Sequence, residues 1–138
     1  MKSAASLRNS RGFTLIEVMA ALVIMAVGMI GLLQALGIAF EHNLRNQMRE
    51  EAVYMGEKYM NELRNSPFEN LSTSYPSMSV TGSARGGTGA FVVDRSAPAL
   101  SVDGTGATVR QLQVLVKWTY KGVQYQNRVI SPVSRPLQ

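Results

Sequence analysis

The stretch RGFTLIEVMAALVIMAVGMIGLLQALGIAF, residues 11–40, decides the fold of this chain. From residue 18 to residue 40 it holds 23 residues without a formal charge. A helix rises 1.5 Å per residue, so such a segment reaches roughly 34 Å, enough for a hydrocarbon core of about 30 Å. We therefore expect a transmembrane helix over residues 13–40. Glu17 is the exception, because a carboxylate within a lipid-facing span is costly and implies a partner, which we expect in another chain.

The charges that flank this span predict its orientation. Lys2, Arg8 and Arg11 precede it with no acidic residue among them, whereas residues 41–51 hold three glutamates and two arginines. Positive charge stays on the cytoplasmic side, so we expect the N-terminus inside and the bulk of the chain outside. A secretory signal peptide has a shorter apolar region that ends at a cleavage site. A plain signal anchor fits the hydropathy but leaves Glu17 unexplained.

The sequence GFTLIEV at residues 12–18, after a short basic leader, resembles the processing site of type IV prepilins and type II secretion pseudopilins. The resemblance implies that prepilin peptidase cleaves after Gly12, which removes a leader of residues 1–12. It further implies methylation of the new N-terminus at Phe13. In pilin-like filaments the residue that matches Glu17 pairs with the N-terminal amine of a neighbouring subunit, and an ion pair of this kind in a low-dielectric bilayer favours one register.

Small residues form a stripe along the same face of the predicted span. At 100° per residue these positions lie within about 40° of Glu17 around the helix. Small residues let membrane helices approach closely, so we expect this stripe to pack against other helices. Its members are Ala21, Gly28, Gly31, Ala35 and Ala39.

Residues 41–65 predict an amphipathic continuation of the helix. Apolar residues recur there at steps of three and four, which is typical of one buried helix face. The helix should end near Asn65, because Pro67 disfavours helix in the residue before it. The stripe is more consistent with intramolecular core than with a partner surface. It comprises Leu44, Met48, Ala52, Met55, Tyr59 and Leu63.

Residues 66–138 predict a small β-rich part. Residues 112–120 and 123–129 alternate apolar with polar positions around Lys121-Gly122, which is typical of a β-hairpin with one buried face. We expect a Gly/Ser-rich loop at residues 72–108 with little regular structure. A two-stranded hairpin alone is marginal, so a third or fourth strand is expected from residues 90–94 or 98–102.

These elements together predict an α+β, pilin-like fold, in which a long N-terminal helix packs on a small antiparallel sheet. The segments at 26–34 and 116–120 are most similar to minor pilins of the PilV type, with the type II secretion minor pseudopilin as the alternative. That resemblance implies a subunit of a pilus priming or tip complex. Its partners would be prepilin peptidase, other minor and major pilins, and the bacterial inner membrane. The chain would cross that membrane once, expose its C-terminal part in the periplasm and then enter the pilus.

The sequence contains little that could support catalysis. The chain has no cysteine, which excludes disulfides and thiolate metal sites, and His42 is its only histidine. Its glycines do not form a phosphate-binding loop, since no Gly-x-x-x-x-Gly-Lys-Ser/Thr pattern is present. We expect no enzyme activity, no catalytic residue, no bound metal and no cofactor.

A binding module for DNA or a host surface is the alternative from another class. The whole chain carries a formal net charge of +5, and residues 71–138 alone hold seven basic and two acidic residues. A basic surface can bind phosphate backbones in a salt-dependent way. A solvated face that keeps an exported domain soluble explains the charge equally well, and after loss of the leader only 11 basic residues oppose 9 acidic ones. We therefore do not expect a nucleic-acid partner.

Overall fold

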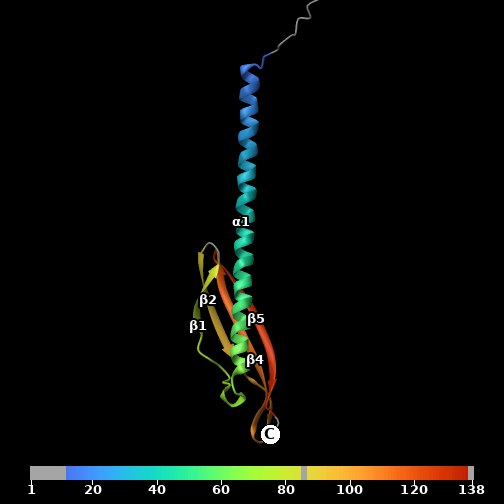
Figure 1. Cartoon of the computed structure of the whole chain (residues 1–138), viewed down its shortest axis with the longest axis vertical. Coiled ribbons are helices and arrows are strands. Elements are labelled where there is room, and N and C mark those ends of the chain that lie inside the picture. Colours follow the sequence, from blue (N-terminus) through green and yellow to red (C-terminus); the bar gives the residue numbers. More distant parts are fainter. Residues whose placement is uncertain (1–11, 85–86, 137–138) are drawn as a thin grey trace, which may run out of the picture. The chain divides into compact units, whose positions relative to one another are not determined.

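The computed structural model describes residues 12–84 and 87–136 of the chain. They form the helix α1 (Leu15–Asn65), the 3-10 helix η1 (Phe68–Asn70) and five strands, which are labelled in part in Figure 1. The chain divides into two compact units, the first ending at Phe40 and the second beginning at Glu41. The leader, residues 1–12, lies outside the described residues except for Gly12.

Helix α1 ends at Asn65, as the sequence predicts. Beyond the last turn, Ser66 donates from its amide to the Leu63 carbonyl at 3.2 Å and from Oγ to the Glu62 carbonyl at 2.9 Å. These bonds satisfy carbonyls that a helix end leaves without an intrahelical partner. Pro67 then precedes η1, so the chain leaves the helix at a position where proline cannot continue it.

In the first unit, the described part of helix α1 exposes its apolar side chains along its length. From Leu15 to Phe40 every described residue is exposed, and within the described residues α1 is the one helix long and apolar enough to cross a membrane. Exposed apolar surface on this scale needs a non-aqueous environment. The finding is consistent with a single-pass membrane anchor.

The second unit contains an antiparallel sheet of five strands. The strands are β1 (Met78–Ala84), β2 (Gly87–Ser96), β3 (Ala99–Asp103), β4 (Gly106–Tyr120) and β5 (Val123–Ser134). Strand β4 pairs with β5 along one edge; along its other edge it pairs first with β3 and then with β2, and β1 pairs with β2. Strand β4 is thus the centre of the sheet.

The predicted hairpin is present as β4 and β5. Its two-residue turn has positive φ at both positions, 49° at Lys121 and 77° at Gly122. Positive φ at both central residues is the mark of the turn whose twist matches antiparallel strands. Trp118 lies opposite Tyr125 in this register. The expected additional strands from 90–94 and 98–102 are also confirmed, as parts of β2 and β3.

The core forms between residues 41–65 of α1 and one face of the sheet. Four members of the predicted helix stripe (Ala52, Met55, Tyr59, Leu63) are buried, whereas Leu44 and Met48 are half-buried. Each fully buried large apolar side chain contributes about 1.5–3 kcal/mol relative to exposure. This confirms the α+β fold and assigns the stripe to the intramolecular core. The large apolar sheet residues that are buried are Phe91, Val93, Leu112, Val114, Val116 and Trp118.

The prediction of a Gly/Ser-rich loop over residues 72–108 is wrong for most of that segment, which contains β1, β2 and β3. The reason is visible at Gly82 and Gly89, which pair across β1 and β2 and are both buried. A Cβ at Gly82 would lie 2.5 Å from the Phe91 ring and 3.0 Å from Met55 Cε, and one at Gly89 would lie 3.4 Å from Met48 Cε. These glycines therefore make room for the ring and the helix, rather than marking a turn.

Candidate functional site

The predicted cleavage position lies directly before the helix, outside regular secondary structure. Gly12 and Phe13 have no regular secondary structure and both are exposed, Phe13 to 88%. A Cβ at Gly12 would meet nothing within 4 Å among the described residues. The fold of this chain therefore does not require glycine there. A protease that approaches the backbone closely would require it.

Thr14 and Glu17 form a capping box at the start of α1. Glu17 Oε2 accepts from the Thr14 amide at 2.8 Å and from Thr14 Oγ1 at 2.9 Å, and Thr14 Oγ1 accepts from the Glu17 amide at 3.3 Å. The Thr14 carbonyl accepts from the amides of Glu17 and Val18. This arrangement satisfies donors that a helix N-terminus leaves open, and a carboxylate there is favoured by the helix dipole.

Glu17 thus has a partner in its own chain, which sequence reasoning missed. The signal was present, since Thr-x-x-Glu before an apolar run is the sequence signature of this cap. The two hydrogen bonds that Thr14 donates to the Glu17 carboxylate both end at Oε2, and no hydrogen bond to Oε1 is found among the described residues. The carboxylate can therefore cap its helix through one oxygen and accept from another donor through the second. Pairing with a neighbouring subunit's amine stays a prediction.

The small-residue stripe has no packing partner in the described part of the chain. Ala21, Gly28, Gly31, Ala35 and Ala39 are all exposed, and a Cβ at Gly28 or Gly31 would meet nothing within 4 Å. The helix continues through both glycines without a break. Packing of this face against other helices stays a prediction.

Four basic side chains of the second unit make ion pairs. Lys117 Nζ lies 2.7 Å from Asp94 Oδ2, and Lys121 Nζ donates to Glu41 Oε1. Arg95 and Arg135 approach Glu62 and Glu69 at 3.7 and 3.6 Å. A hydrogen bond from Lys117, and a second from Ser77, lower the pKa of Asp94. These pairs neutralise much of the basic surface that the sequence suggested for nucleic acid.

Arg95 also holds the fold together. Its guanidinium lies 5.6 Å from the centre of the Tyr59 ring and 5.2 Å from that of Tyr75, which joins the helix to the segment before β1. Such cation–π contacts add to packing where the cation is shielded from water. This arginine is therefore structural. Within residues 12–84 and 87–136 no group of three or more metal-ligating side chains comes together.

Comparison with known proteins identifies the N-terminal segment. Residues 7–33 match the family described as "Prokaryotic N-terminal methylation motif". The matched range includes Gly12, Phe13 and Glu17 and ends before Ala35. Neither a curated protein nor a solved structure matches the chain.

The match and the fold agree on a general class. The methylation motif supports a type IV pilin-like prepilin, that is, a pilin or a pseudopilin, and with it processing by prepilin peptidase. Proteins of this class are structural subunits. The long helix with a small antiparallel sheet is consistent with the pilin fold.

Proposed function

We propose that this chain is a minor type IV pilin of the PilV type, a structural subunit that takes part in priming pilus assembly or in forming the pilus tip. The observation that carries the proposal is the methylation motif at residues 7–33, whose cleavage position is exposed directly before a capped, apolar helix. The PilV-type assignment draws on the anchor-helix segment 26–34 and the β4 segment 116–120. A type II secretion minor pseudopilin has the same motif and remains the alternative within the class.

Processing is tested by the intact mass of the membrane-extracted full chain, expressed with and without a prepilin peptidase. We expect a peptidase-dependent product that begins at Phe13 and carries one added methyl group. Gly12→Val should abolish cleavage and Gly12→Ala should weaken it, because each adds atoms where the protease approaches the backbone. A chain that keeps Met1 in the presence of the peptidase would refute the proposal.

Assembly is tested at Glu17 with two substitutions that separate its two roles. Glu17→Gln keeps an oxygen that can accept from Thr14, since Gln also serves in a capping box, but removes the charge. Thr14→Ala weakens the cap and keeps the charge. If Glu17 sets subunit register by pairing with an amine, Glu17→Gln should be cleaved normally yet enter filaments poorly, whereas Thr14→Ala should enter them. If Glu17→Gln instead entered filaments normally and Thr14→Ala did not, incorporation would depend on the helix cap and not on the charge of Glu17.

Deletion of the gene in its own host tests whether the chain serves a type IV pilus or a type II secretion pseudopilus. Loss of surface pili with normal protein secretion supports the minor pilin. Loss of secretion with normal pili would assign the chain to the secretion pseudopilus. A shift of DNA by the purified chain at low salt would instead revive the binding-module alternative.

A further inference from the structure

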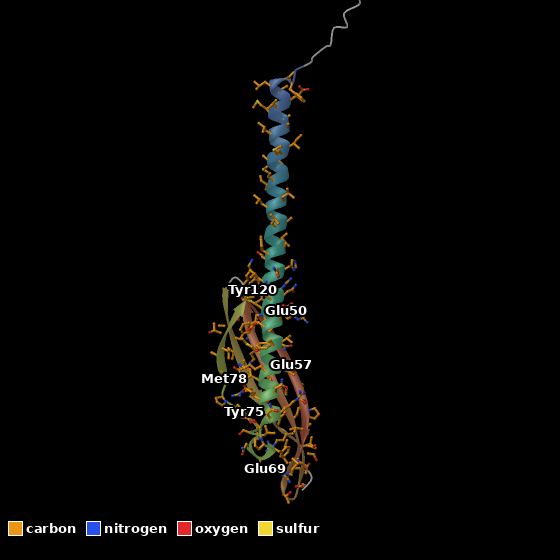
Figure 2. All side chains as sticks on the ribbon, viewed as in Figure 1. Glu50, Glu57, Glu69, Tyr75, Met78 and Tyr120 are labelled. Atoms are coloured by element: carbon orange, nitrogen blue, oxygen red, sulfur yellow. The ribbon has the colours of Figure 1, made fainter. Side chains whose placement is uncertain are left out.

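The tip of the β4–β5 hairpin contacts the first residue after the apolar span. Lys121 in the turn donates to Glu41, and Glu41 directly follows Phe40. The hydrogen bond and opposite charges lower the pKa of Glu41 and raise the pKa of Lys121, so both stay ionised at neutral pH. Figure 2 shows Tyr120 at this end of the second unit and Glu69 at the other. Because Glu41 directly follows residue 40 in sequence, a membrane span over residues 13–40 would bring the hairpin tip to the headgroups.

A pocket of about 480 Å³ opens near this tip, between α1 and β5. Arg45 and Arg49, one helical turn apart, line it together with amide side chains that include Asn46 and Asn127. Trp118 and Tyr125 also line it, and their rings stack with centroids 5.7 Å apart and an interplanar angle of 18°. The pocket therefore combines two cations, amide donors and an aromatic wall.

The charged side chains that line this pocket are both basic, although Glu41 lies close enough for Arg45 to add to the lowering of its pKa by Lys121. No acidic residue lines it among the described residues, although Glu50 lies with Arg49 on the adjoining helix surface. The four ion pairs found in the described residues do not include Arg45 or Arg49. Arg45 instead contacts His42, with 2.8 Å between its Nη2 and His42 Nδ1. Two guanidinium groups beside a pocket without a carboxylate favour an anionic ligand.

We propose that this pocket binds the phosphodiester headgroup of an anionic phospholipid, an inference that rests on the membrane anchoring in the proposed function. Guanidinium forks match phosphate oxygens in a bidentate way, and the volume lies within the range of small-ligand pockets. The stacked rings of Trp118 and Tyr125 form one wall of the pocket beside these cations. Because Arg45 follows the expected span by only five residues, a chain anchored by that span would bring the site close to the headgroups. An amine headgroup would find no carboxylate in the pocket lining.

Trp118 is the only tryptophan of the chain and reports on the pocket directly. The full chain in a non-ionic detergent is titrated with dihexanoyl-phosphatidylglycerol while Trp118 fluorescence is followed. We expect a saturable change, with half-saturation weakened about 30-fold in the double variant Arg45→Gln/Arg49→Gln, since each basic residue near an anionic lipid strengthens binding about fivefold. The double variant Lys58→Gln/Arg128→Gln is the charge-matched control, because both residues are exposed and lie outside the pocket, and it should titrate like the parent.

Two further titrations identify the source of the phosphate. Dihexanoyl-phosphatidylcholine should bind more weakly than the glycerol lipid, and inorganic phosphate at matched ionic strength should not saturate the change over the same concentrations. Saturation by inorganic phosphate with the same arginine dependence would make this a soluble-anion site and overturn the lipid assignment. No response to lipid, as expected if the pocket receives an acidic side chain of another pilin, or a double variant that titrates like the parent, would also overturn it.

The titration does not require cleavage of the leader. A chain that stays uncleaved in the presence of the peptidase and yet binds the glycerol lipid would therefore refute the proposed function while the lipid site stands. A correctly processed chain that ignores the lipid would refute the site alone.

Discussion

Gly56 of α1 faces β5 so closely that a single methyl group there should reveal the helix–sheet contact. An added Cβ would lie 2.9 Å from Val129 Cγ2 and 3.3 Å from Asn127 Nδ2. Alanine favours helix over glycine by about 0.8–1.0 kcal/mol, whereas overpacking costs about 1–3 kcal/mol. We therefore expect Gly56→Ala to lower the free energy of unfolding by about 0–2 kcal/mol.

The same substitution should have the opposite sign when its neighbour is trimmed. In a Val129→Ala background the nearest atom is gone, so Gly56→Ala should raise the free energy of unfolding by up to about 1 kcal/mol through helix propensity. The assay is urea denaturation of the full chain in non-ionic detergent, followed by the fluorescence of Trp118, which is 6% exposed in the core. Ile130→Ala, at a 47% exposed neighbour on the other face of β5, is the matched control.

The control should leave the effect of Gly56→Ala unchanged, because Ile130 does not face the helix. Contacting residues show coupling energies of about 0.5–3 kcal/mol, whereas independent sites add within about 0.5 kcal/mol. Additive effects of Gly56→Ala and Val129→Ala would refute the close approach of α1 to β5.

Three further changes are tested by the same denaturation assay. Leu63→Asp should lower the free energy of unfolding by more than about 4 kcal/mol, because Leu63 is 3% exposed and its replacement buries an unpaired carboxylate. Val53→Asp, at a 42% exposed site, should lower it by less than about 1 kcal/mol. Equal losses of stability would contradict the assignment of the stripe to the core. Because the pKa of Asp94 is lowered from its ordinary value of 3.8, ionised Asp94 stabilises the fold above pH 3.8, and this stabilisation is lost as the pH falls through the lowered pKa. Asp94→Asn should therefore reduce the loss of stability at acid pH. An unaltered dependence of stability on pH would count against the pairing of Asp94 with Lys117. Gly122→Ala should lower the free energy of unfolding by about 1–3 kcal/mol, because the φ of Gly122 is 77°. Gly104→Ala should leave stability nearly unchanged, because Gly104 lies in open space without a positive φ. Similar losses of stability at both sites would argue against the left-handed backbone at Gly122.

The parts of the fold predicted correctly are those in which local periodicity and burial coincide. The end of α1 is marked by Pro67, and the β4–β5 hairpin combines strict alternation with a turn at Lys121-Gly122. By contrast, β1 and β2 contain glycines because Phe91 and the helix need space across the sheet. That requirement comes from residues distant in sequence, so no local pattern distinguishes Gly82 and Gly89 from turn glycines.

The candidate site divides in the same way. Gly12, Phe13 and Glu17 belong to a local motif, so their roles can be predicted from the sequence alone, and these roles stay predictions. The cap between Thr14 and Glu17 is also local and could have been recognised. The pocket between Arg45 and Tyr125 forms because α1 packs beside β5, and these two residues are 80 positions apart in the sequence. Only the folded chain brings its cations to the aromatic pair.

The position of β4 at the centre of the sheet has a consequence for the order in which the molecule matures. A ribosome makes α1 first, yet β4 pairs with three strands and supplies Leu112, Val114, Val116 and Trp118 to the core. The core cannot close before these late residues arrive, because contacts of long sequence separation form only when both partners exist. During elongation the apolar stripe of residues 41–65 therefore stays uncovered. A holding chaperone would recognise this stripe, and a chain stalled at that stage would aggregate by contacts between such stripes.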